Sequence, residues 1–323
     1  SPMFCITSPS CEYYALRLPL LKAGFKRLHT HLPSNLLWGR SLMIRPTAQM
    51  VCAHQRFNHF PRTYTLGCKL GLAQRLHRVK KSLRDVFDFF PQTWIFPEQK
   101  ESLMKAMDQA RPQRFIWKPA RGSCGKGIFV CPGGEKNSVN RSYVVQEYVD
   151  DPLLLEGRKM DLRLYVAVTS YDPLTVYLHD EGLVRLAVQQ YNEGAHFDPF
   201  RDLTNYSIGR KWVKKGKQFG HLKKSMEELW NHIDSLCPTS DHVWNSIAQV
   251  IVKTLLAVKS TMSKGVKSFF ELYGFDMMLD SSLKPWLVEV NTLPSLASTS
   301  TFDYTVKTNI ISDLLNLAMI EPF

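Results

Sequence analysis

Several features that would place a chain in a familiar class are missing from this sequence of 323 residues. Its longest apolar stretches fall well short of the roughly 18 residues that a membrane-spanning helix needs, so we expect no membrane segment. No clear secretory signal is present either. The chain begins at Ser1 rather than Met, and we therefore expect native residues ahead of it.

The seven cysteines show neither the pattern of a disulfide framework nor that of a zinc site. They form no Cys-x-x-Cys pair, and no histidine stands at zinc-finger spacing from them. An odd, scattered set of thiols is typical of a reduced, cytosolic protein. The sequence also lacks aromatic-basic clusters of the RNA-binding type, which argues against nucleic-acid binding.

Positive charge is abundant and is concentrated at one end of the chain. The net charge is +12, and residues 1–100 hold 15 Lys and Arg against 4 Asp and Glu. A basic front part on a nearly neutral remainder favours attraction to a polyanion, such as nucleic acid, an anionic membrane or an acidic protein tail. The plain alternative is a solvated basic surface that has no partner.

Short strand-like runs fill the middle of the chain. Residues 142–149 and 160–170, with the runs FIWKP, IFVC, LTVYLHD and GLVRLAV, have the composition and alternation of strands. Apolar spacing predicts helices over 81–90, 242–260 and 306–320. The segment FPQTWIFPEQKESLMKAM predicts a short extended piece followed by a helix that starts near Pro97, and the rest of the first 110 residues looks mixed and irregular. Several antiparallel strands in close succession predict an α+β fold rather than a doubly wound one.

Residues 271–296 are the most informative segment. Two apolar runs, 272–279 and 285–290, have the length and composition of strands, and the serines between them indicate the turn of a hairpin. Asp276 lies in the first run. Glu289 and Asn291 lie two apart in the second run, so their side chains share one face of that strand.

Two carboxylates and an amide oxygen make a hard, all-oxygen site of the kind that suits Mg²⁺ with nucleotide phosphates. The alternative is that Asp276 and Glu289 only decorate a solvated hairpin. Both residues, however, lie in runs too apolar to be exposed on both faces. A buried carboxylate needs a cation or a partner, which favours the metal site.

The segment RFIWKPARGSCGKGIFV predicts a phosphate-binding loop. Lys118 ends a strand, and Lys126 lies in a loop with Gly122, Gly125 and Gly127. Backbone N–H groups of such a loop approach phosphate oxygens closely, and the lysines neutralise charge. The loop is neither a Walker A motif, since Lys126 is followed by glycine, nor a dinucleotide fingerprint, since a strand follows it. A glycine-rich hairpin tip is also often only a turn.

Other polar residues fall where strands are expected. Lys159, Asp161 and Arg163 alternate, so they face one side of a strand and either pair with each other or line a cleft for a nucleotide and an acid. Arg185 is a lone cation among apolar neighbours, for which we expect a carboxylate partner. The strand end at 146–149 could present its backbone to an adenine edge, or be an ordinary strand end. Taken alone, the segment DLTNYS reads as a capped turn.

In order along the chain, the motifs IWKP, GKGI, QEYV, KMDLRLYV, TSYDPLTVYLHDEGLVR, LTNYS, ELYGFDMMLD and KPWLVEVN resemble the tubulin tyrosine ligase-like family. These proteins are ATP-grasp amino acid ligases that modify tubulin. The resemblance covers about residues 56–318. TSYDPL, EGLVR and LTNYS look like the glutamylase branch, and FNHFPRTYTLG and ISDLLNLA are most similar to members that start glutamate side chains.

The resemblance implies an ATP-grasp fold in which the nucleotide is held between two antiparallel sheets. It implies three subdomains: a basic N-terminal one that docks the substrate (1–110), a central one (111–190) and a C-terminal one with the magnesium site (191–323).

By motif, the resemblance also implies roles for individual residues. Those expected to bind ATP are Lys118, Gly125, Lys126, Gly127, Gln146, Glu147, Tyr148, Val149, Lys159, Asp161, Thr204 and Asn205. Those expected to bind Mg²⁺ are Asp276, Glu289 and Asn291. Those expected to bind the incoming amino acid are Arg185, Tyr206, Ser207 and Lys223. Those expected to act in catalysis are Arg163, Arg185 and Glu289.

Three positions depart from the family pattern or add to it. Asp202 stands where the family usually has His, and its carboxylate would repel an incoming glutamate or compete for Arg185. Lys223 lies in a segment, GHLKKSM, that departs from the usual spacing and lacks the expected Trp. Cys124 in the glycine-rich loop would make nucleotide binding sensitive to thiol reagents.

The expected activity is ATP-dependent addition of glutamate, through an isopeptide bond, to glutamate side chains in acidic tubulin tails, by way of an acyl phosphate. The expected cofactors are ATP and Mg²⁺. The expected partners are microtubules and free L-glutamate, for a monomer with no nucleic-acid or membrane partner in the cytoplasm and cytoskeleton, including the cilium or basal body. The alternatives are a ligase for glycine or tyrosine, and an inactive ligase that only binds microtubules.

Overall fold

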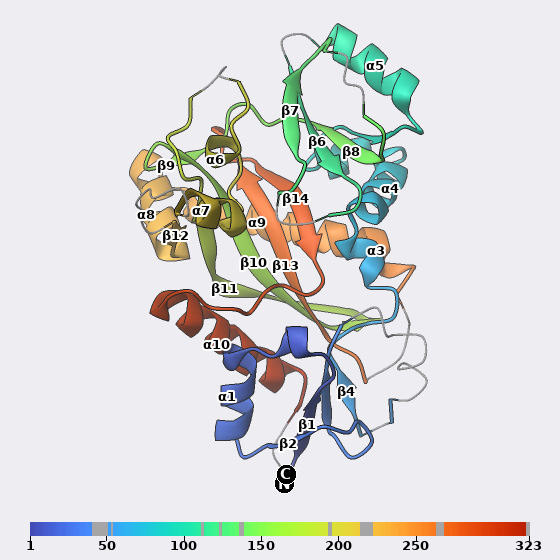
Figure 1. Ribbon diagram of the computed structural model, residues 1–323, viewed down its shortest axis with the longest axis vertical. Coiled ribbons are helices and arrows are strands. Elements are labelled where there is room, and N and C mark those ends of the chain that lie inside the picture. The colour runs from blue at the N-terminus through green and yellow to red at the C-terminus, as the bar shows by residue number, and fades with distance from the viewer. Residues whose placement is uncertain are drawn as a thin grey trace.

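The computed structural model describes residues 1–40, 51–52, 54–110, 113–122, 125–135, 139–192, 196–213, 222–262 and 268–320. Its strands form three sheets (Figure 1). A large antiparallel sheet occupies the middle of the molecule, with a smaller antiparallel sheet towards one end and a parallel sheet towards the other. The mixture of helices with mainly antiparallel sheets confirms the predicted α+β class.

The large sheet has the strand order β12-β11-β10-β13-β14, and β9 pairs with β10. Its strands are β9 (Leu154–Leu155), β10 (Arg158–Tyr171), β11 (Leu174–Leu186), β12 (Lys223–Lys224), β13 (Glu271–Leu279) and β14 (Pro285–Asn291). Helices α8 (Met226–Leu236) and α9 (Ser240–Lys259) cover one face, and α10 (Thr301–Leu317) with α1 (Tyr14–Lys22) packs on the other. The predicted hairpin over 271–291 and the helix over 242–260 are confirmed.

Alternation along β10 decides which side chains reach the site. Leu162 and Leu164 point into the core beneath α9, whereas Tyr165 packs in the core beneath α10. Lys159, Asp161 and Arg163 have the same parity as Tyr165, and they therefore lie on the face turned away from α9. The even-numbered leucines anchor the strand, which leaves the odd positions for polar chemistry.

The small sheet has the order β5-β8-β6-β7 and is antiparallel throughout. Its strands are β5 (Thr93–Phe96), β6 (Arg114–Pro119), β7 (Phe129–Pro132) and β8 (Tyr143–Glu147). Helix α5 (Lys100–Gln109) packs on it over an aromatic core that includes Trp94 and Trp117. Because β5 precedes residue 110 while its partner β8 follows it, this sheet joins segments from either side of the predicted boundary.

The boundary predicted at residue 190 also falls inside a sheet, because β10 and β11 precede it while β13 and β14 follow it. The division into three subdomains stays a prediction.

The expectation of irregular structure before residue 110 is wrong, because that part contains a parallel sheet of order β2-β1-β3-β4. Its strands are β1 (Met3–Ile6), β2 (Lys26–Leu28), β3 (Leu36–Trp38) and β4 (Arg56–Phe57). Runs of two to four residues are too short to show a strand period. The 3-10 helix η1 (Pro9–Cys11) and the helices α3 (Tyr64–Gly67) and α4 (Lys69–Lys80) also lie here.

The α-helix predicted over 81–90 is also wrong, since only a 3-10 turn, η3 (Arg84–Phe87), forms there. Leu83 and Val86, which suggested a helical face, are exposed, whereas Phe87, Phe89 and Phe90 are buried. The buried phenylalanines lie in a largely irregular segment, and their spacing in the sequence resembles the apolar face of a helix. Two short helices, α6 (Pro199–Asp202) and α7 (Tyr206–Val213), complete the fold. Among the described residues, no helix is both long and apolar enough to cross a bilayer.

Candidate active site

Two adjoining cavities lie between the small sheet and the large sheet. The first has a volume of about 110 Å³ and the second about 540 Å³. Lys118 from β6, Arg185 from β11 and Glu289 from β14 line both of them. The two cavities are therefore parts of one site, with charged side chains at their junction.

The first cavity combines apolar walls with a polar edge. Ile116 from the small sheet and Met278 and Leu287 from the large sheet line it, and Leu203 adds a further apolar wall. The predicted adenine-contacting residues, Gln146–Val149, line it as well. A cavity with apolar walls and polar residues at its edge has the chemistry to take a planar base. Thr204 and Asn205 also line this cavity, as does Gly125 of the glycine-rich loop.

The turn between β13 and β14 sets the register of the predicted metal ligands. Asp280 accepts hydrogen bonds from the backbone of Ser282 at 2.9 Å and Lys284 at 3.0 Å, and from the Trp286 ring N–H at 2.8 Å. This closes the hairpin in the register that pairs Met277 with Leu287, and a one-residue shift in the register of β14 then places Glu289 opposite Asp276. Residues directly opposite each other in a ladder share a face of the sheet, so the two carboxylates meet.

The three predicted magnesium ligands converge in the structure. Asn291 Nδ2 lies 3.4 Å from both Asp276 Oδ2 and Glu289 Oε1. Asp276 lines the first cavity, Asn291 the second, and Glu289 both. Within the described ranges, no three His, Cys, Asp or Glu side chains are grouped so as to hold a metal ion. The predicted set instead combines two carboxylates with an amide.

Asp276 is fixed by two arginines. Arg163 Nη2 donates to its Oδ2 at 2.9 Å, and Arg185 Nη2 lies 2.9 Å from the same oxygen. Arg185 also pairs with Asp161, its Nε donating at 2.7 Å. The carboxylate partner expected for Arg185 is thus present twice. Burial opposes ionisation, but the guanidinium charges outweigh it and hold the pKa of Asp276 well below its ordinary value.

The pKa of Glu289 is shifted in the opposite direction to that of Asp276. Burial and the neighbouring charge of Asp276 raise the pKa of its carboxyl group, and the only nearby ion pair among the described residues is with Lys69, at 4.0 Å. A cation beside Glu289 would relieve both effects. The Asn291 amide turns its Nδ2 towards the two carboxylates. With the amide group rotated by half a turn, its Oδ1 would complete a set of the hard oxygen atoms that Mg²⁺ prefers, and these residues then fit the ion.

Lys118 faces the same junction. Its ammonium group donates to Gln146 Oε1 at 2.6 Å, and Gln146 in turn donates to Thr93 Oγ1 at 2.9 Å. Burial lowers the pKa of Lys118 to about 8, so the group is a cation at neutral pH whose hydrogen-bond partner is a neutral amide. A phosphate oxygen would supply the missing negative charge.

The glycine-rich loop reaches the site only in part. Gly125 has φ +71°, and a Cβ atom there would lie 2.9 Å from Ile208 Cδ1, so the close approach to α7 requires glycine. Lys126 and Gly127 are exposed, and neither lines the first or the second cavity. The structure therefore does not bring Lys126 to the first cavity. Cys124 lies outside the described residues.

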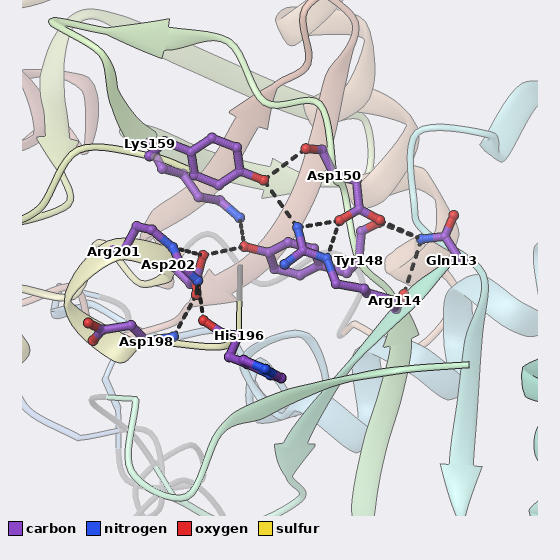
Figure 2. Close-up of polar contacts among 10 residues, drawn as sticks. Gln113, Arg114, Tyr148, Asp150, Lys159, His196, Asp198, Arg201 and Asp202 are labelled. Carbon is purple, nitrogen blue, oxygen red and sulfur yellow. Dashed lines mark hydrogen bonds and ion pairs between the residues drawn. The ribbon is translucent and has the colours of Figure 1, made fainter. Parts of the chain in front are cut away.

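A polar network closes the far side of the first cavity (Figure 2). Lys159 Nζ donates to the Tyr148 hydroxyl at 2.6 Å, and that hydroxyl donates to Asp202 Oδ1 at 3.3 Å. Arg201 Nη2 donates to Asp202 Oδ2 at 2.7 Å. The expectation that Asp202 would compete for Arg185 is wrong: Asp202 pairs with Arg201, whereas Arg185 pairs with Asp161 and Asp276.

The second cavity is strongly basic and takes in the predicted amino-acid residues. Tyr206, Ser207 and Lys223 all line it. Lys223 Nζ lies 4.7 Å from the centre of the Tyr206 ring and donates to Asp303 Oδ2 at 2.6 Å. Arg163 and Arg185 line the same cavity, which suits an anionic substrate.

Sequence reasoning missed three charged residues of the site. Lys69, at the start of α4, lines both cavities, and Lys307 on α10 lines the second. Asp303, which is fully buried, holds both Lys223 and Lys307, at 2.6 and 2.8 Å. Lys69 and Lys223 contact residues that are 80 or more positions away in the sequence. Asp303 and Lys307 lie in an ordinary amphipathic helix, so no local motif identifies any of these contacts.

A slot with apolar walls, two convergent carboxylates and a basic second cavity together suit the activation of an acid by a nucleotide phosphate. Comparison with known proteins agrees with this chemistry. Human tubulin monoglutamylase TTLL4 is 38% identical over 87% of the chain, and a probable beta-tubulin polyglutamylase from Tetrahymena thermophila is 35% identical over 82%. Mouse tubulin polyglutamylase TTLL7 is 32% identical over 96%.

The chain spans only 25%, 24% and 36% of the length of these three relatives, in that order. The similarity thus concerns one region of much longer proteins. A family model, described as the tubulin-tyrosine ligase family, matches residues 47–323. Since that match covers most of the sequence, the chain belongs to the tubulin-tyrosine ligase family.

Proposed function

We propose that this chain is the catalytic region of an ATP-dependent ligase that adds glutamate to glutamate side chains in the acidic C-terminal tails of tubulin. The observation that carries the proposal is the shared wall of the two cavities. Lys118, Arg185 and Glu289 line both, so a phosphate group in the first cavity and a carboxylate in the second would meet at one point. Ligation through an acyl phosphate requires that meeting.

The nucleotide is assigned to the first cavity. Its base would lie against Ile116 and Leu287 beside the Gln146–Val149 edge, with Thr204 and Asn205 nearby. Lys159 and Asp161 would hold the ribose and phosphate side. This is the arrangement of an ATP-grasp fold, in which the nucleotide is held between the small and the large antiparallel sheet.

Magnesium is assigned to Asp276, Glu289 and Asn291. When bound there, the ion would neutralise the phosphate charge between the two cavities. Lys118, a buried cation with an amide as its partner, would stabilise the negative charge that develops on the transferred phosphoryl group. Arg163 donates to Asp276, and this contact holds the carboxylate in place and favours its charged form.

The free glutamate is assigned to the second cavity. Its carboxylates would be received by Arg185 and by Lys223, with Tyr206 and Ser207 beside them. The α-amino group would attack the phosphorylated side-chain carboxylate of the tubulin tail, forming an isopeptide bond and releasing phosphate. No protein nucleophile takes part in this scheme.

The charge of the molecule suits an acidic acceptor. Residues 1–100 carry most of the net positive charge, and Lys69 brings part of it to both cavities. The names of the relatives agree, since all three are described as tubulin glutamylases. We therefore assign the protein to the cytoskeleton, as a monomeric enzyme that starts glutamate side chains, with the cilium or basal body as a further location.

The test is transfer of labelled amino acids to purified microtubules with Mg-ATP. Glutamate, glycine and tyrosine are compared at equal concentration, and the labelled product is digested to locate the modified residue. We expect glutamate alone to be incorporated, at a tail glutamate. Uptake of glycine or tyrosine instead would overturn the assignment of the second cavity, and microtubule binding without uptake would leave only an inactive ligase.

A further inference from the structure

We propose that Asp202 is a positioning residue for the nucleotide: acting through Tyr148, it keeps the Lys159 ammonium group in place and charged at the wall of the first cavity. This inference rests on the proposed nucleotide site and goes beyond it, because Asp202 itself is given no role there. The residue lies on α6, outside both sheets, and is nearly fully buried.

The order of the hydrogen bonds defines the role. Tyr148 carries a single hydroxyl proton, and the structure directs that proton to Asp202 Oδ1 (Figure 2). The phenolic oxygen is thereby left as an acceptor facing Lys159 Nζ at 2.6 Å. Lys159 must be the donor in this contact. The ammonium group also lies 3.9 Å from the centre of the Tyr148 ring, where the positive charge is favoured.

Asp202 is held so that it cannot turn away from Tyr148. Arg201 Nη2 donates to its Oδ2 at 2.7 Å, and the backbone N–H of Asp198 donates to the same oxygen at 2.8 Å. Asp198 caps the start of α6 by accepting from the Phe200 N–H at 2.9 Å. The remaining oxygen, Oδ1, is the one that receives the tyrosine hydroxyl. The carboxylate is a fixed charge rather than a mobile one.

Among the charges around Lys159, the Asp202 carboxylate does most to keep the ammonium group protonated. Burial lowers the pKa of Lys159 to about 7, and among the neighbouring charges Asp202 counters this most strongly. Asp150 acts in the same sense but is paired with Arg114, while Arg114 and Lys118 oppose a further positive charge. Removing the Asp202 charge would let Lys159 lose its proton at lower pH. A neutral amine has little attraction for phosphate.

The experiment measures the dissociation constant of a Mg²⁺-bound, non-hydrolysable ATP analogue between pH 6 and pH 9, for wild type and Asp202→Asn. Taking the ratio of the two constants cancels the titration of the ligand and of other shared groups. If the substitution lowers the pKa of Lys159 by one unit, the ratio is less than about twofold at pH 6 and rises to about tenfold at pH 8.

Asp198→Asn is the matched control. It removes one negative charge from the start of the same short helix, and asparagine caps a helix as well as aspartate does. The Asp198 carboxylate points away from Tyr148 in Figure 2. We expect its ratio to stay within about twofold of one at every pH.

Three results would overturn the inference. A ratio for Asp202→Asn that is raised equally at all pH values would mean that the residue only supports the fold. A ratio near one would mean that it has no part in binding. If wild type binds no nucleotide at any pH, the proposed function fails as well, which distinguishes the two failures.

Tyr148→Phe guards against misfolding of the first variant. It keeps the aromatic ring and the Asp202–Arg201 pair but removes the hydroxyl group between Asp202 and Lys159. Because Lys159 loses an acceptor that favours its charged form, the ratio of dissociation constants for this variant is also expected to grow with pH. A ratio that does not change with pH in Tyr148→Phe would contradict the role of the tyrosine.

Discussion

At the scale of single residues, the site is built from charges that the folded chain keeps at a cost. Lys118 is buried on β6 with an amide oxygen as its hydrogen-bond partner, and burial lowers its pKa from 10.5 to about 8. The folded state therefore holds this proton less tightly than the unfolded state does. Below pH 8 the cost is about 3 kcal/mol of folding free energy, and it disappears as the pH rises towards 10.5.

We predict that Lys118→Met stabilises the protein without nucleotide while removing nucleotide binding. The free energy of unfolding at pH 7 should rise by about 1–2 kcal/mol. The substitution removes the cost of burying the Lys118 charge, and this gain exceeds the loss of the hydrogen bond to Gln146, which contributes roughly 1 kcal/mol. Urea unfolding at pH 7 and pH 10 measures this. At pH 10 the difference in free energy of unfolding between the variant and wild type should be smaller than at pH 7. A variant less stable than wild type at both pH values would contradict the account.

At the scale of elements, the β13–β14 hairpin places the proposed metal ligands. Its register depends on Asp280, which binds two backbone N–H groups and the Trp286 ring N–H across the turn. A slip of one residue would send Glu289 to the other face of the sheet, away from Asp276. The turn and the site are therefore coupled, although Asp280 lines neither cavity.

Asp280→Ala should lower the free energy of unfolding by about 2–3 kcal/mol, because four donors at the turn lose their acceptor. Binding of Mg-ATP should weaken with it. Urea unfolding and calorimetry check the two effects. Ser281→Ala, at the exposed tip of the same turn, is the control and should change stability by less than about 0.5 kcal/mol. Equal stability of the two variants would show that Asp280 does not define the turn.

Elements with a complete local signal are predictable from the sequence. The β13–β14 hairpin has two apolar runs and a turn, and α9 has a long apolar stripe at helical spacing, so the sequence alone predicts both. The parallel sheet escapes prediction because strands such as Arg56–Phe57 are too short to show a period. The stripe at 81–90 misleads because phenylalanines packed from an irregular chain resemble a helical face.

The candidate site divides in the same way. Residues inside motifs, such as Asp276 and Lys118, are predictable from the sequence, whereas Lys69 and Asp303 are not. Lys69 lies 220 positions from its ion-pair partner Glu289, a separation that no window of the sequence reveals. The pairing of Asp202 with Arg201 depends on the geometry of a single helical turn, so the sequence suggests a competition with Arg185 that does not occur.

At the scale of the whole molecule, the small and large sheets enclose the site, and the parallel sheet is attached to the large one. His59, which follows β4, contacts Glu271 of β13 at 2.6 Å, so the parallel sheet is fastened to the large sheet. Lys69, Lys118 and Glu289 then come to the cavities from α4, the small sheet and the large sheet. Substrates can react only if these parts hold their relative positions.

The central claim is that the residues shared by the two cavities, Lys118, Arg185 and Glu289, catalyse the transfer of glutamate to tubulin with Mg-ATP. The most direct measurement is the rate of labelled glutamate transfer to microtubules by wild type, Glu289→Gln and Glu227→Gln. Glu227 is an exposed residue on α8 and serves as the control. We predict a loss of roughly 100-fold or more for Glu289→Gln and an unchanged rate for the control. Transfer at the wild-type rate by Glu289→Gln would contradict the account.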